Sequence, residues 1–453
     1  MKKIQFHPLY EQQSGHWKKL IDTYEGTGGF RDGAYLYRHD RESDSKFINR
    51  CRMAKYFNFA EIIVDTFRDS CLRERPIRAV EDKNLQNIMM DVDFQARDWD
   101  SFIRDQLTLS LVYGFSDALV EMPSFDPDAI QSRADAENLN IRPYLISLHP
   151  LDIINWDYDR YGLSSVMIRE TARREIQPGD DDDAEWKILT NYRRYDRERW
   201  TLFDADGAEI ASGEHSLGII PIVRLFYRKS LTNSILGRSI LPDPAVFIDY
   251  YNLDSEKREI FRQQTFSLLL ISLGENSSRD DIQNLVLTGT NNALALPYGA
   301  KAEFISPDPE QARLIIEEQK QIVRTIFRLK HLKYDTDSGT EKSGEAYKWD
   351  YKDMHEILAG IAKNLETFEY QIVRLISLWT RNNKIASRFS VSYPREFNVH
   401  SLSETLETAA KLFELNLGTE LRNTFSKRVL IPKLLSLTVE EKEKIFKNIE
   451  ETA

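Results

Sequence analysis

The sequence predicts an α+β fold that is mainly helical. Three observations lead to this prediction: two long helical runs within residues 308–381, a series of short strands in the middle of the chain, and amphipathic segments near both ends. Apolar residues three and four positions apart mark the helices, and short runs rich in β-branched and aromatic residues mark the strands. At 453 residues, the chain is long enough for two or three structural modules.

The first long run covers residues 308–332. Asp308 is a good N-cap, Pro309 suits the first helical position, and Gln311 follows three residues after the cap. The second run covers residues 343–379. Its apolar stripe advances by steps of three and four, which predicts one buried face over about ten turns: Met354, Leu358, Ile361, Leu365, Phe368, Ile372, Ile376 and Trp379. The break between the runs, residues 334–342, is polar and contains glycine.

The N-terminal part reads as helical. Helices are expected over residues 17–24, 46–75 and 98–111, the second of them ending before Pro76. Gly-Thr-Gly-Gly at residues 26–29 has no strand before it and no Lys-Ser/Thr after it, so we interpret it as a turn and not as a phosphate-binding loop. Strands follow at residues 118–122 and 144–148, then a β meander through residues 166–173, 185–195, 199–203 and 208–211, and a strand at residues 223–226.

A second helical region begins at about residue 240. Residues 240–264 form a helix whose later half is charged all round, so we expect it to pack weakly inside its own subunit and to meet neighbouring copies or solvent. Residues 265–308 contain short strands at 266–273, 292–296 and 302–305, which predicts a small module at the tip of a helical hairpin. A strand at residues 388–393 and three capped helices complete the chain.

Composition excludes several classes of protein. The net charge of −11 argues against a protein that grips nucleic acid over its whole surface, because such binding depends on Lys and Arg neutralising phosphates. No apolar run reaches the length of a membrane span, and the N-terminus lacks the apolar segment of a signal peptide. Cys51 and Cys71 are expected to be free thiols.

Signatures of catalysis are missing. The sequence has no phosphate-loop motif, no Gly-x-Ser-x-Gly, no His-Glu-x-x-His and no cysteine pairs at zinc spacing. We therefore expect no catalytic residue, no metal site, no cofactor and no enzymatic activity. One alternative stays open, a metal-dependent hydrolase or nuclease that uses Asp180, Asp181, Asp182 and Asp183. A solvated loop is the preferred interpretation, because four consecutive side chains cannot all point at one ion.

Several stretches occur in the order found in one known family. They are Gly28-Gly29 with Tyr35-Leu36-Tyr37-Arg38-His39 and Glu42; Arg50, Arg52, Ala54 and Asn58; Tyr113-Gly114-Phe115-Ser116-Asp117; His149-Pro150-Leu151-Asp152-Ile153-Ile154-Asn155-Trp156; Gly218-Ile219-Ile220-Pro221; the helix from Pro242 to Gln264; and Ser343-Gly344-Glu345-Ala346. This ordered series resembles the portal (head–tail connector) proteins of tailed bacteriophages.

The resemblance implies a portal-like fold with wing, stem, clip and crown modules. It places the wing at residues 1–239, a first stem helix at 240–264, the clip at 265–308, a second stem helix at 309–332, a tunnel loop at 333–343, a long wing helix and strand at 344–399, and a helical crown at 400–453. It also implies a ring of about twelve copies at one capsid vertex of the virion, assembled in the host cytoplasm. The ring is the channel for packaging and ejection of genomic DNA.

The resemblance further implies partners and sites. The partners are other copies of the chain, double-stranded DNA, the terminase, the head–tail adaptor, the major capsid protein and a scaffold protein, with no membrane. The channel and tunnel-loop residues are Arg328, Lys330, His331, Lys333, Tyr334, Asp335, Thr336, Asp337, Ser338, Gly339, Thr340, Glu341 and Lys342. The inter-subunit stem residues are Asp254, Glu256, Lys257, Arg258 and Glu259. The last-turn cations also suit the negative end of a helix dipole, and both interpretations stay open. Another ring-forming virion connector is the remaining alternative.

Overall fold

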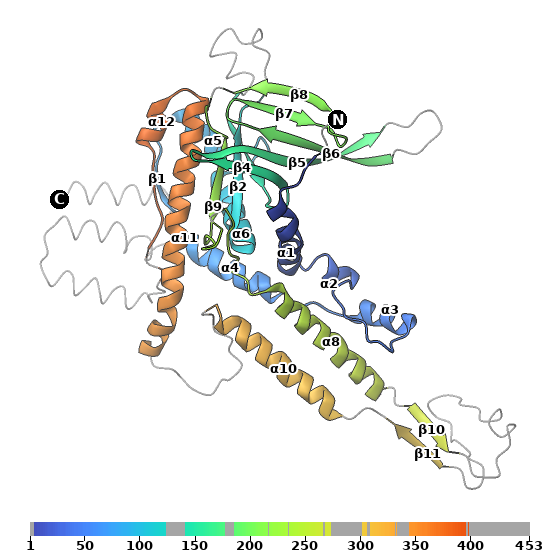
Figure 1. Ribbon diagram of the computed structural model, residues 1–453. Helices are drawn as coiled ribbons and strands as arrows, with labels where there is room; N and C mark the ends of the chain where they lie inside the picture. The colour runs from blue at the N-terminus through green and yellow to red at the C-terminus, as the bar shows by residue number, and fades with distance from the viewer. Residues whose placement is uncertain are drawn as a thin grey trace, which may run out of the picture. The chain divides into compact units, whose positions relative to one another are not determined.

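The computed structural model describes residues 4–123, 141–176, 185–215, 217–233, 235–265, 268–272, 301–305, 309–330, 332, 344–395 and 397 (Figure 1). The chain divides into two compact units, Met1–Arg395 and Glu396–Ala453, and all the elements below belong to the first. Helices and strands both contribute substantially, which confirms the α+β class. The predicted C-terminal helices, and the strand expected at residues 292–296, lie outside the described residues.

Six helices precede the strand β2, Phe115–Glu121, in the chain: α1 Pro8–Glu25, α2 Gly29–Asp32, α3 Asp44–Met53, α4 Phe59–Cys71, α5 Lys83–Met90 and α6 Trp99–Tyr113. The single helix expected over residues 46–75 is wrong, because residues 54–58 are not helical and separate α3 from α4. Asn58 begins α4 by accepting a hydrogen bond from Glu61 N at 3.0 Å, and its amide donates to Tyr24 O at 2.7 Å. The helical spacing of apolar residues continues across residues 54–58, so the N-cap residue Asn58 is the only sign of the break in the sequence.

The glycine-rich turn after α1 is built over a buried carboxylate. Gly26 ends the helix in the left-handed region at φ 64°. Asp22, only 5% exposed, accepts hydrogen bonds from the hydroxyls of Tyr35 at 2.7 Å and Thr27 at 3.1 Å. A Cβ at Gly28 would lie 2.2 Å from an Asp22 carboxylate oxygen. The turn prediction is confirmed, and a carboxylate at its centre would repel a phosphate.

Two antiparallel sheets follow. The first has the order β3-β2-β9, with bounds β2 Phe115–Glu121, β3 Tyr144–Leu148 and β9 Ile222–Phe226. The second runs in sequence order, with bounds β4 Ile153–Asp159, β5 Gly162–Ile176, β6 Glu185–Tyr195, β7 Arg199–Phe203 and β8 Glu209–Glu214. The predicted meander is confirmed. The strand β4, which leads into it, was not predicted.

The long helix α11, Gly344–Trp379, packs on β2, β9 and α4. Its predicted stripe is buried from Met354 to Ile376, and Trp379 donates its indole N–H to Val120 O at 2.8 Å. After α12, Asn383–Arg388, the strand β12, Ser390–Ser392, pairs with β1, Ile77–Ala79. The C-terminal strand is therefore shorter than the predicted residues 388–393, because a helical turn occupies its first part.

A buried carboxylate holds this corner together. Glu369 of α11 is fully buried and accepts two hydrogen bonds from the Arg78 guanidinium, at 2.7 and 2.8 Å. The Trp99 indole N–H also donates to it at 3.0 Å, and the Tyr393 hydroxyl donates to its other oxygen. One carboxylate thus joins α11, β1, α6 and the residue after β12.

Two helices run side by side away from the sheets, and a two-stranded sheet lies at their far end (Figure 1). The bounds are α8 Pro244–Thr265, β10 Leu268–Ser272, β11 Lys301–Ile305 and α10 Pro309–Arg328. β10 and β11 pair antiparallel. The expectation of two adjacent helices with an insert at their tip is confirmed for these residues. Among the described helices, none combines the length and the apolar character that a membrane span needs.

Candidate functional site

The loop of residues 227–239, which follows β9, presents three cations. Arg238 N donates to Arg228 O at 2.8 Å, and Lys229 pairs with Gly237 in an antiparallel bridge. Arg228, Lys229 and Arg238 are all exposed. Because Arg228 and Arg238 are cross-strand neighbours, their charges are held close together in spite of the ten residues between them.

Glycine contacts and one amide fix the base of this loop. A Cβ at Gly237 would lie 2.2 Å from Gly114 O, and Gly114 itself has φ +93°, so both positions require glycine. Tyr227 N donates to Gly114 O at 3.0 Å. From α11, Asn364 donates its side-chain amide to Phe226 O at 2.9 Å. The loop is therefore attached to both the first sheet and the long helix.

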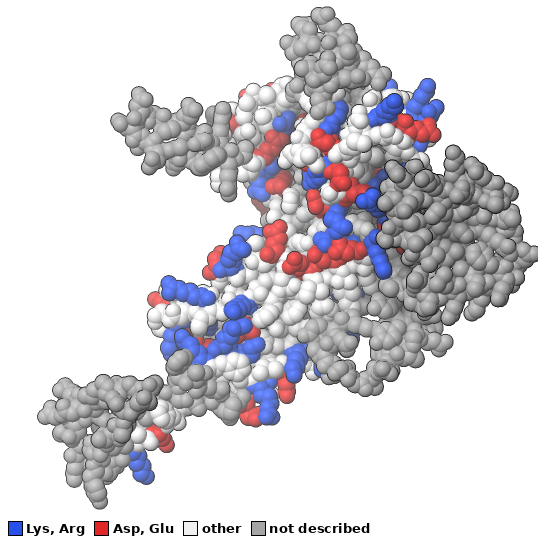
Figure 2. Space-filling view, turned by 180° about the vertical axis from the view of Figure 1, so that it is seen from behind, with Lys and Arg blue, Asp and Glu red and all other residues white. Residues whose placement is uncertain are grey.

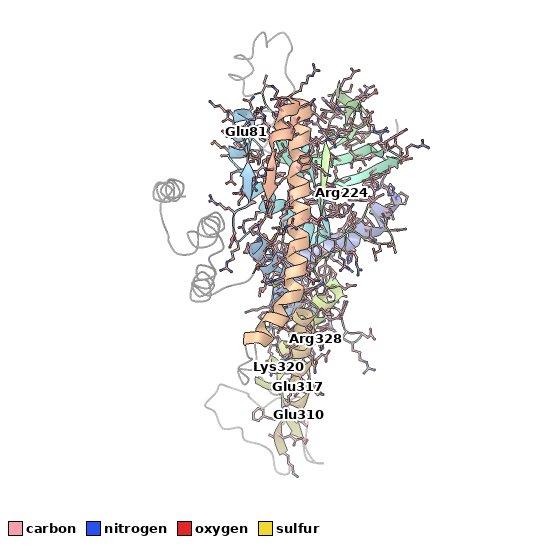
Figure 3. All side chains as sticks on the ribbon, turned by 90° about the vertical axis from the view of Figure 1, so that its left-hand side faces the viewer. Glu81, Arg224, Glu310, Glu317, Lys320 and Arg328 are labelled. Atoms are coloured by element: carbon pink, nitrogen blue, oxygen red, sulfur yellow. The ribbon has the colours of Figure 1, made fainter. Side chains whose placement is uncertain are left out.

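A buried ion pair supports the other side of the loop. Arg224, labelled in Figure 3, donates to both carboxylate oxygens of Asp117, at 2.8 and 2.9 Å. Its remaining terminal nitrogen donates to Ile235 O at 2.7 Å, and its guanidinium lies 4.3 Å from the centre of the Phe115 ring. The charge of Arg224 is thus neutralised, and its role is to hold the loop that displays the exposed cations.

Lys330 brings a fourth cation to this place. It follows the end of α10, where its backbone N donates to Phe327 O at 3.1 Å. Burial lowers the pKa of the Lys330 ammonium, and the positive charges of Arg238 and Arg228 lower it further. Lys330 is therefore near enough to Arg228 and Arg238 for their charges to act on its ammonium group. We call Arg228, Lys229, Arg238 and Lys330 the cationic cluster.

The cluster is positively charged and has no acidic partner among the residues that the structure describes. Within the described part of the chain, none of its four members forms an ion pair; Lys229 lies 4.9 Å from the centre of the Phe226 ring. On the face of the molecule shown in Figure 2, Lys and Arg lie interleaved with Asp and Glu. Grouped like charges repel one another, and an anion that binds between them relieves the repulsion. The arrangement therefore suits a phosphate or another oxyanion.

The predicted channel residues separate in the structure. Lys330 belongs to the cationic cluster, whereas Arg328 is exposed on the outer side of α10, in line with Lys320 (Figure 3). Arg328 remains well placed to complement the helix dipole, because it is in the last turn. His331 and residues 333–342 lie outside the described residues.

Sequence reasoning missed Arg228, Lys229 and Arg238. A signal for them exists, since residues 225–242 contain these three cations and no Asp or Glu. This signal is weak, because residues 282–302 and 370–395 are longer segments that also contain no Asp or Glu. The proximity of the three cations to Lys330, about ninety positions later, depends on tertiary contacts.

The charged half of α8 is better packed than the sequence suggested. Asp254 is fully buried and pairs with Lys257 at 2.7 Å and Arg258 at 2.5 Å. Lys257 also donates to the Gln319 side-chain oxygen of α10 at 2.7 Å, and Glu259 pairs with Arg262 at 2.9 Å. The expectation that this segment packs weakly inside its own subunit is therefore wrong. Burial of Asp254 within one subunit leaves it no surface for a neighbouring copy.

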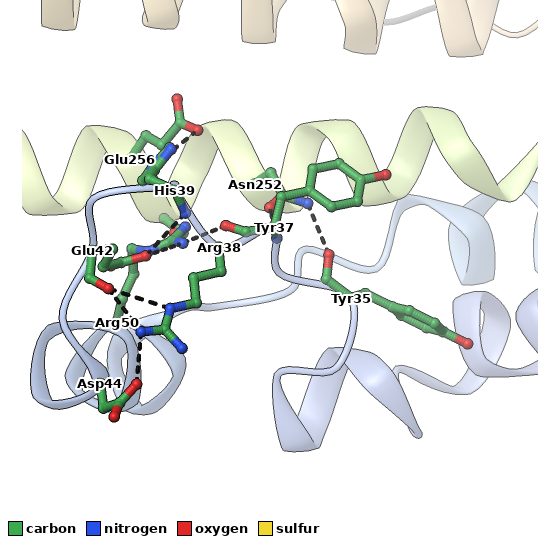
Figure 4. A network of polar contacts seen from close by, with 10 residues as sticks. Tyr35, Tyr37, Arg38, His39, Glu42, Asp44, Arg50, Asn252 and Glu256 are labelled. Atoms are coloured by element: carbon green, nitrogen blue, oxygen red, sulfur yellow. Dashed lines mark hydrogen bonds and ion pairs between the residues drawn. The ribbon is translucent and has the colours of Figure 1, made fainter.

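The segment before α3 is fastened to α8 (Figure 4). Arg50, buried, bonds to both carboxylate oxygens of Glu42, at 3.0 and 2.9 Å, and to the Ser255 hydroxyl of α8 at 3.0 Å. Asn252 of α8 accepts from Tyr37 N at 2.7 Å. His39 lies 3.8 Å from Glu256. The contacts of Asn252 and Ser255 cover one side of α8 with residues from the N-terminal region, and Glu256, at the edge of that side, keeps a side chain that is 35% exposed.

This fastening is expected to weaken in acid. The hydrogen bond from Arg50 holds the pKa of the Glu42 carboxyl below its ordinary value. A lowered pKa means that the pair stabilises the fold fully above the unfolded-state pKa of about 4.3, and that the contribution is lost as pH falls through the lower folded-state pKa. The difference in melting temperature between wild type and Glu42→Gln should be constant above about pH 5.5 and shrink below about pH 4. A difference independent of pH would contradict this assignment.

The described residues offer little for catalysis. Burial raises the pKa of the Cys71 thiol to about 12 and also raises that of Cys51, so both remain thiols at neutral pH. No group of three or more His, Cys, Asp or Glu side chains in the described ranges is placed to hold a metal ion. Asp180, Asp181, Asp182 and Asp183 lie outside these ranges.

The sequence was compared with models of known protein families and with curated proteins, and neither comparison gave a match.

Proposed function

We propose that the chain is a portal protein of a tailed bacteriophage: a ring-forming subunit that surrounds a channel for genomic double-stranded DNA at one capsid vertex. The main support is the position of the cationic cluster. It lies where α10 ends, beside the base of the α8–α10 hairpin, while the opposite end of the hairpin carries β10 and β11. A hairpin with a basic end and a separate module at its other end suits a subunit that contacts DNA at one level and partner proteins at another.

The charge distribution suits DNA that moves. Lys and Arg that neutralise phosphates supply most of the sequence-independent affinity for DNA. A chain of net charge −11 with one local cluster of cations would hold phosphates briefly, while its acidic residues prevent adhesion along the whole channel. Arg228, Arg238 and Lys330 are the residues we assign to this contact. His331, Lys333 and Lys342 would extend it through the proposed tunnel loop at residues 333–343.

The remaining modules follow the same proposal. Residues 1–239 form the wing, α8 and α10 the stem, residues 265–308 the clip and residues 400–453 the crown. The clip would dock the terminase during packaging and the head–tail adaptor afterwards. The major capsid protein and a scaffold protein are the expected neighbours of the wing, and the protein would be located in the virion.

The alternative of a metal-dependent hydrolase or nuclease has no supporting observation among the described residues. Its test is the loss of a Mg²⁺-dependent activity on Asp182→Ala. A different ring-forming virion connector would share the ring but not the terminase-docking role, and terminase binding separates the two.

Electron microscopy of the purified protein in negative stain, with native mass spectrometry of the same sample, tests the proposal. We expect rings of about twelve subunits with an open central channel. The protein should be examined alone and with a scaffold protein, over a range of salt concentrations. A compact monomer or dimer under all these conditions would overturn the proposal.

A further inference from the structure

The exposed side of α10 carries charges whose sign changes along the helix. Its outer residues follow one another at steps of three and four: Glu310, Arg313, Glu317, Lys320, Arg324 and Arg328. Such spacing places them on one face, and the four that are labelled in Figure 3 follow one another along the helix. The first half of the face is mainly acidic, with Arg313 paired to Glu310 at 3.5 Å. The second half is basic.

The basic half of this face has two cations that are available to a partner. Lys320 and Arg328 are exposed, and neither forms an ion pair with the described residues of its own chain. Eight residues separate them, a rise of about 12 Å along the helix.

The neighbouring helix α8 has an acidic counterpart. Asp249 is exposed and has no ion-pair partner among the described residues, and Glu256 has only the long contact with His39, at 3.8 Å. Seven residues separate the two carboxylates, a rise of about 10.5 Å. The spacing of the acidic pair thus matches that of the basic pair.

The two pairs also lie at the same heights on the antiparallel hairpin. Lys257 bonds to Gln319 at 2.7 Å, so the adjacent residues Glu256 and Lys320 are at one level. The Phe59 ring contacts both Tyr250, at 5.2 Å between ring centres, and Phe327, at 6.3 Å.

The contacts of the Phe59 ring define a second height that the two helices share. Because Phe59 touches Tyr250 and Phe327, Asp249 and Arg328, the residues next to them, lie at a common height. Each carboxylate on α8 therefore has a cation at its own height on α10.

The two charged faces point to opposite sides of the hairpin. On α8, Glu256 comes one residue before the contact residue Lys257. On α10, Lys320 comes one residue after its partner Gln319. One residue turns a helix by about 100°. Lys257 and Gln319 point toward each other, so their side-chain directions are opposite. Because the helices are antiparallel, one residue back on α8 and one residue forward on α10 rotate these directions in the same sense. Glu256 and Lys320 therefore point to opposite sides of the hairpin. The acidic face and the basic face therefore cannot meet within one chain.

We propose that they meet between copies: Asp249 and Glu256 of one chain pair with Arg328 and Lys320 of the next. The contact is heterologous, with one face of each copy against the opposite face of its neighbour. Because paired charges share a height, repetition about an axis along the hairpin closes a ring instead of climbing into a filament. This inference rests on the proposed ring and identifies the stem surfaces that join its subunits. It also assigns Arg328 to the subunit interface and leaves Lys330 to the DNA.

Charge exchange tests the pairing. The variant Lys320→Glu/Arg328→Glu makes both faces acidic, and the variant Asp249→Lys/Glu256→Lys makes both faces basic. Each variant alone should need at least about tenfold more protein than wild type for half-assembly, because like charges face each other across every interface. An equimolar mixture of the two should restore assembly, with the two variants alternating around the ring. The fourfold variant, in which both faces are reversed, should assemble by itself.

Controls distinguish this inference from the proposed function. Lys18→Glu/Lys19→Glu makes the same change in net charge as Lys320→Glu/Arg328→Glu, on exposed residues of α1, and should assemble as wild type does. Ring populations are read by native mass spectrometry, and the two variants carry different mass labels. If wild type and both single-face variants form rings equally well, the pairing is overturned and the portal proposal stands. If wild type forms no ring with or without scaffold protein, both are overturned. Mixing that fails to restore rings, while each variant alone is defective, also overturns the pairing.

Discussion

Replacing Arg228, Arg238 and Lys330 with glutamine should weaken the binding of double-stranded DNA by the assembled protein and reduce its salt dependence. Each phosphate neutralised by a cation contributes about 0.9 to the slope of log K against log salt concentration, so three contacts contribute about 2.7. The loss should be greatest at low salt and should not depend on DNA sequence, because phosphates carry no sequence information. Fluorescence anisotropy with a short duplex at several salt concentrations measures the slope.

A matched control removes charges elsewhere. Lys18, Lys19 and Lys363 are exposed on α1 and α11, and their replacement by glutamine removes the same charge from the chain. This control variant should keep the wild-type slope within about 0.5. Equal slopes for the cluster variant and wild type would show that the cationic cluster does not contact DNA.

Glu369→Ala should destabilise the first unit by about 3–5 kcal/mol, the usual cost of removing one partner of a buried ion pair. The variant leaves the Arg78 guanidinium, which is 14% exposed, without its main carboxylate. It also removes the acceptor for the Trp99 indole N–H and the Tyr393 hydroxyl. Unfilled hydrogen-bonding groups in a buried position add to the loss. Chemical denaturation followed by circular dichroism measures the free energy of unfolding.

The exposed Glu356, on the same helix, supplies the comparison. Glu356→Ala removes a carboxylate from α11 at the surface and should change the free energy of unfolding by less than about 0.5 kcal/mol. Adding Arg78→Met to Glu369→Ala should recover part of the stability, because it removes a largely buried guanidinium that has lost Glu369 and keeps only the half-exposed Asp100, at 2.6 Å, as its carboxylate partner. A loss below about 1 kcal/mol for Glu369→Ala would contradict the role of this carboxylate.

The helices and strands with strong local patterns could be predicted from the sequence. The apolar stripe of α11 and the alternation in the strands of the meander repeat over many residues, and a proline marks the start of α10. A repeat of this kind states which face of an element is apolar, whatever eventually covers that face. The two helices with an insert at their tip were predicted for the same reason.

Contacts between distant residues could not be predicted in this way. Residues 54–58 interrupt an apolar period because Asn58 is held by Tyr24 of another helix. β1 and β12 are three residues each and are strands only because they pair.

The charges illustrate the same limit. Sequence spacing shows which residues share a face of one helix, but it does not show which other element lies opposite. Asp254 looked exposed because its neighbours are charged, yet α10 and the segment before α3 cover that part of α8. Lys330 could be identified as a cation at a helix end, but its proximity to Arg228 and Arg238 arises from a loop about a hundred residues earlier. The energy of a charge depends on what surrounds it, and folding sets those surroundings.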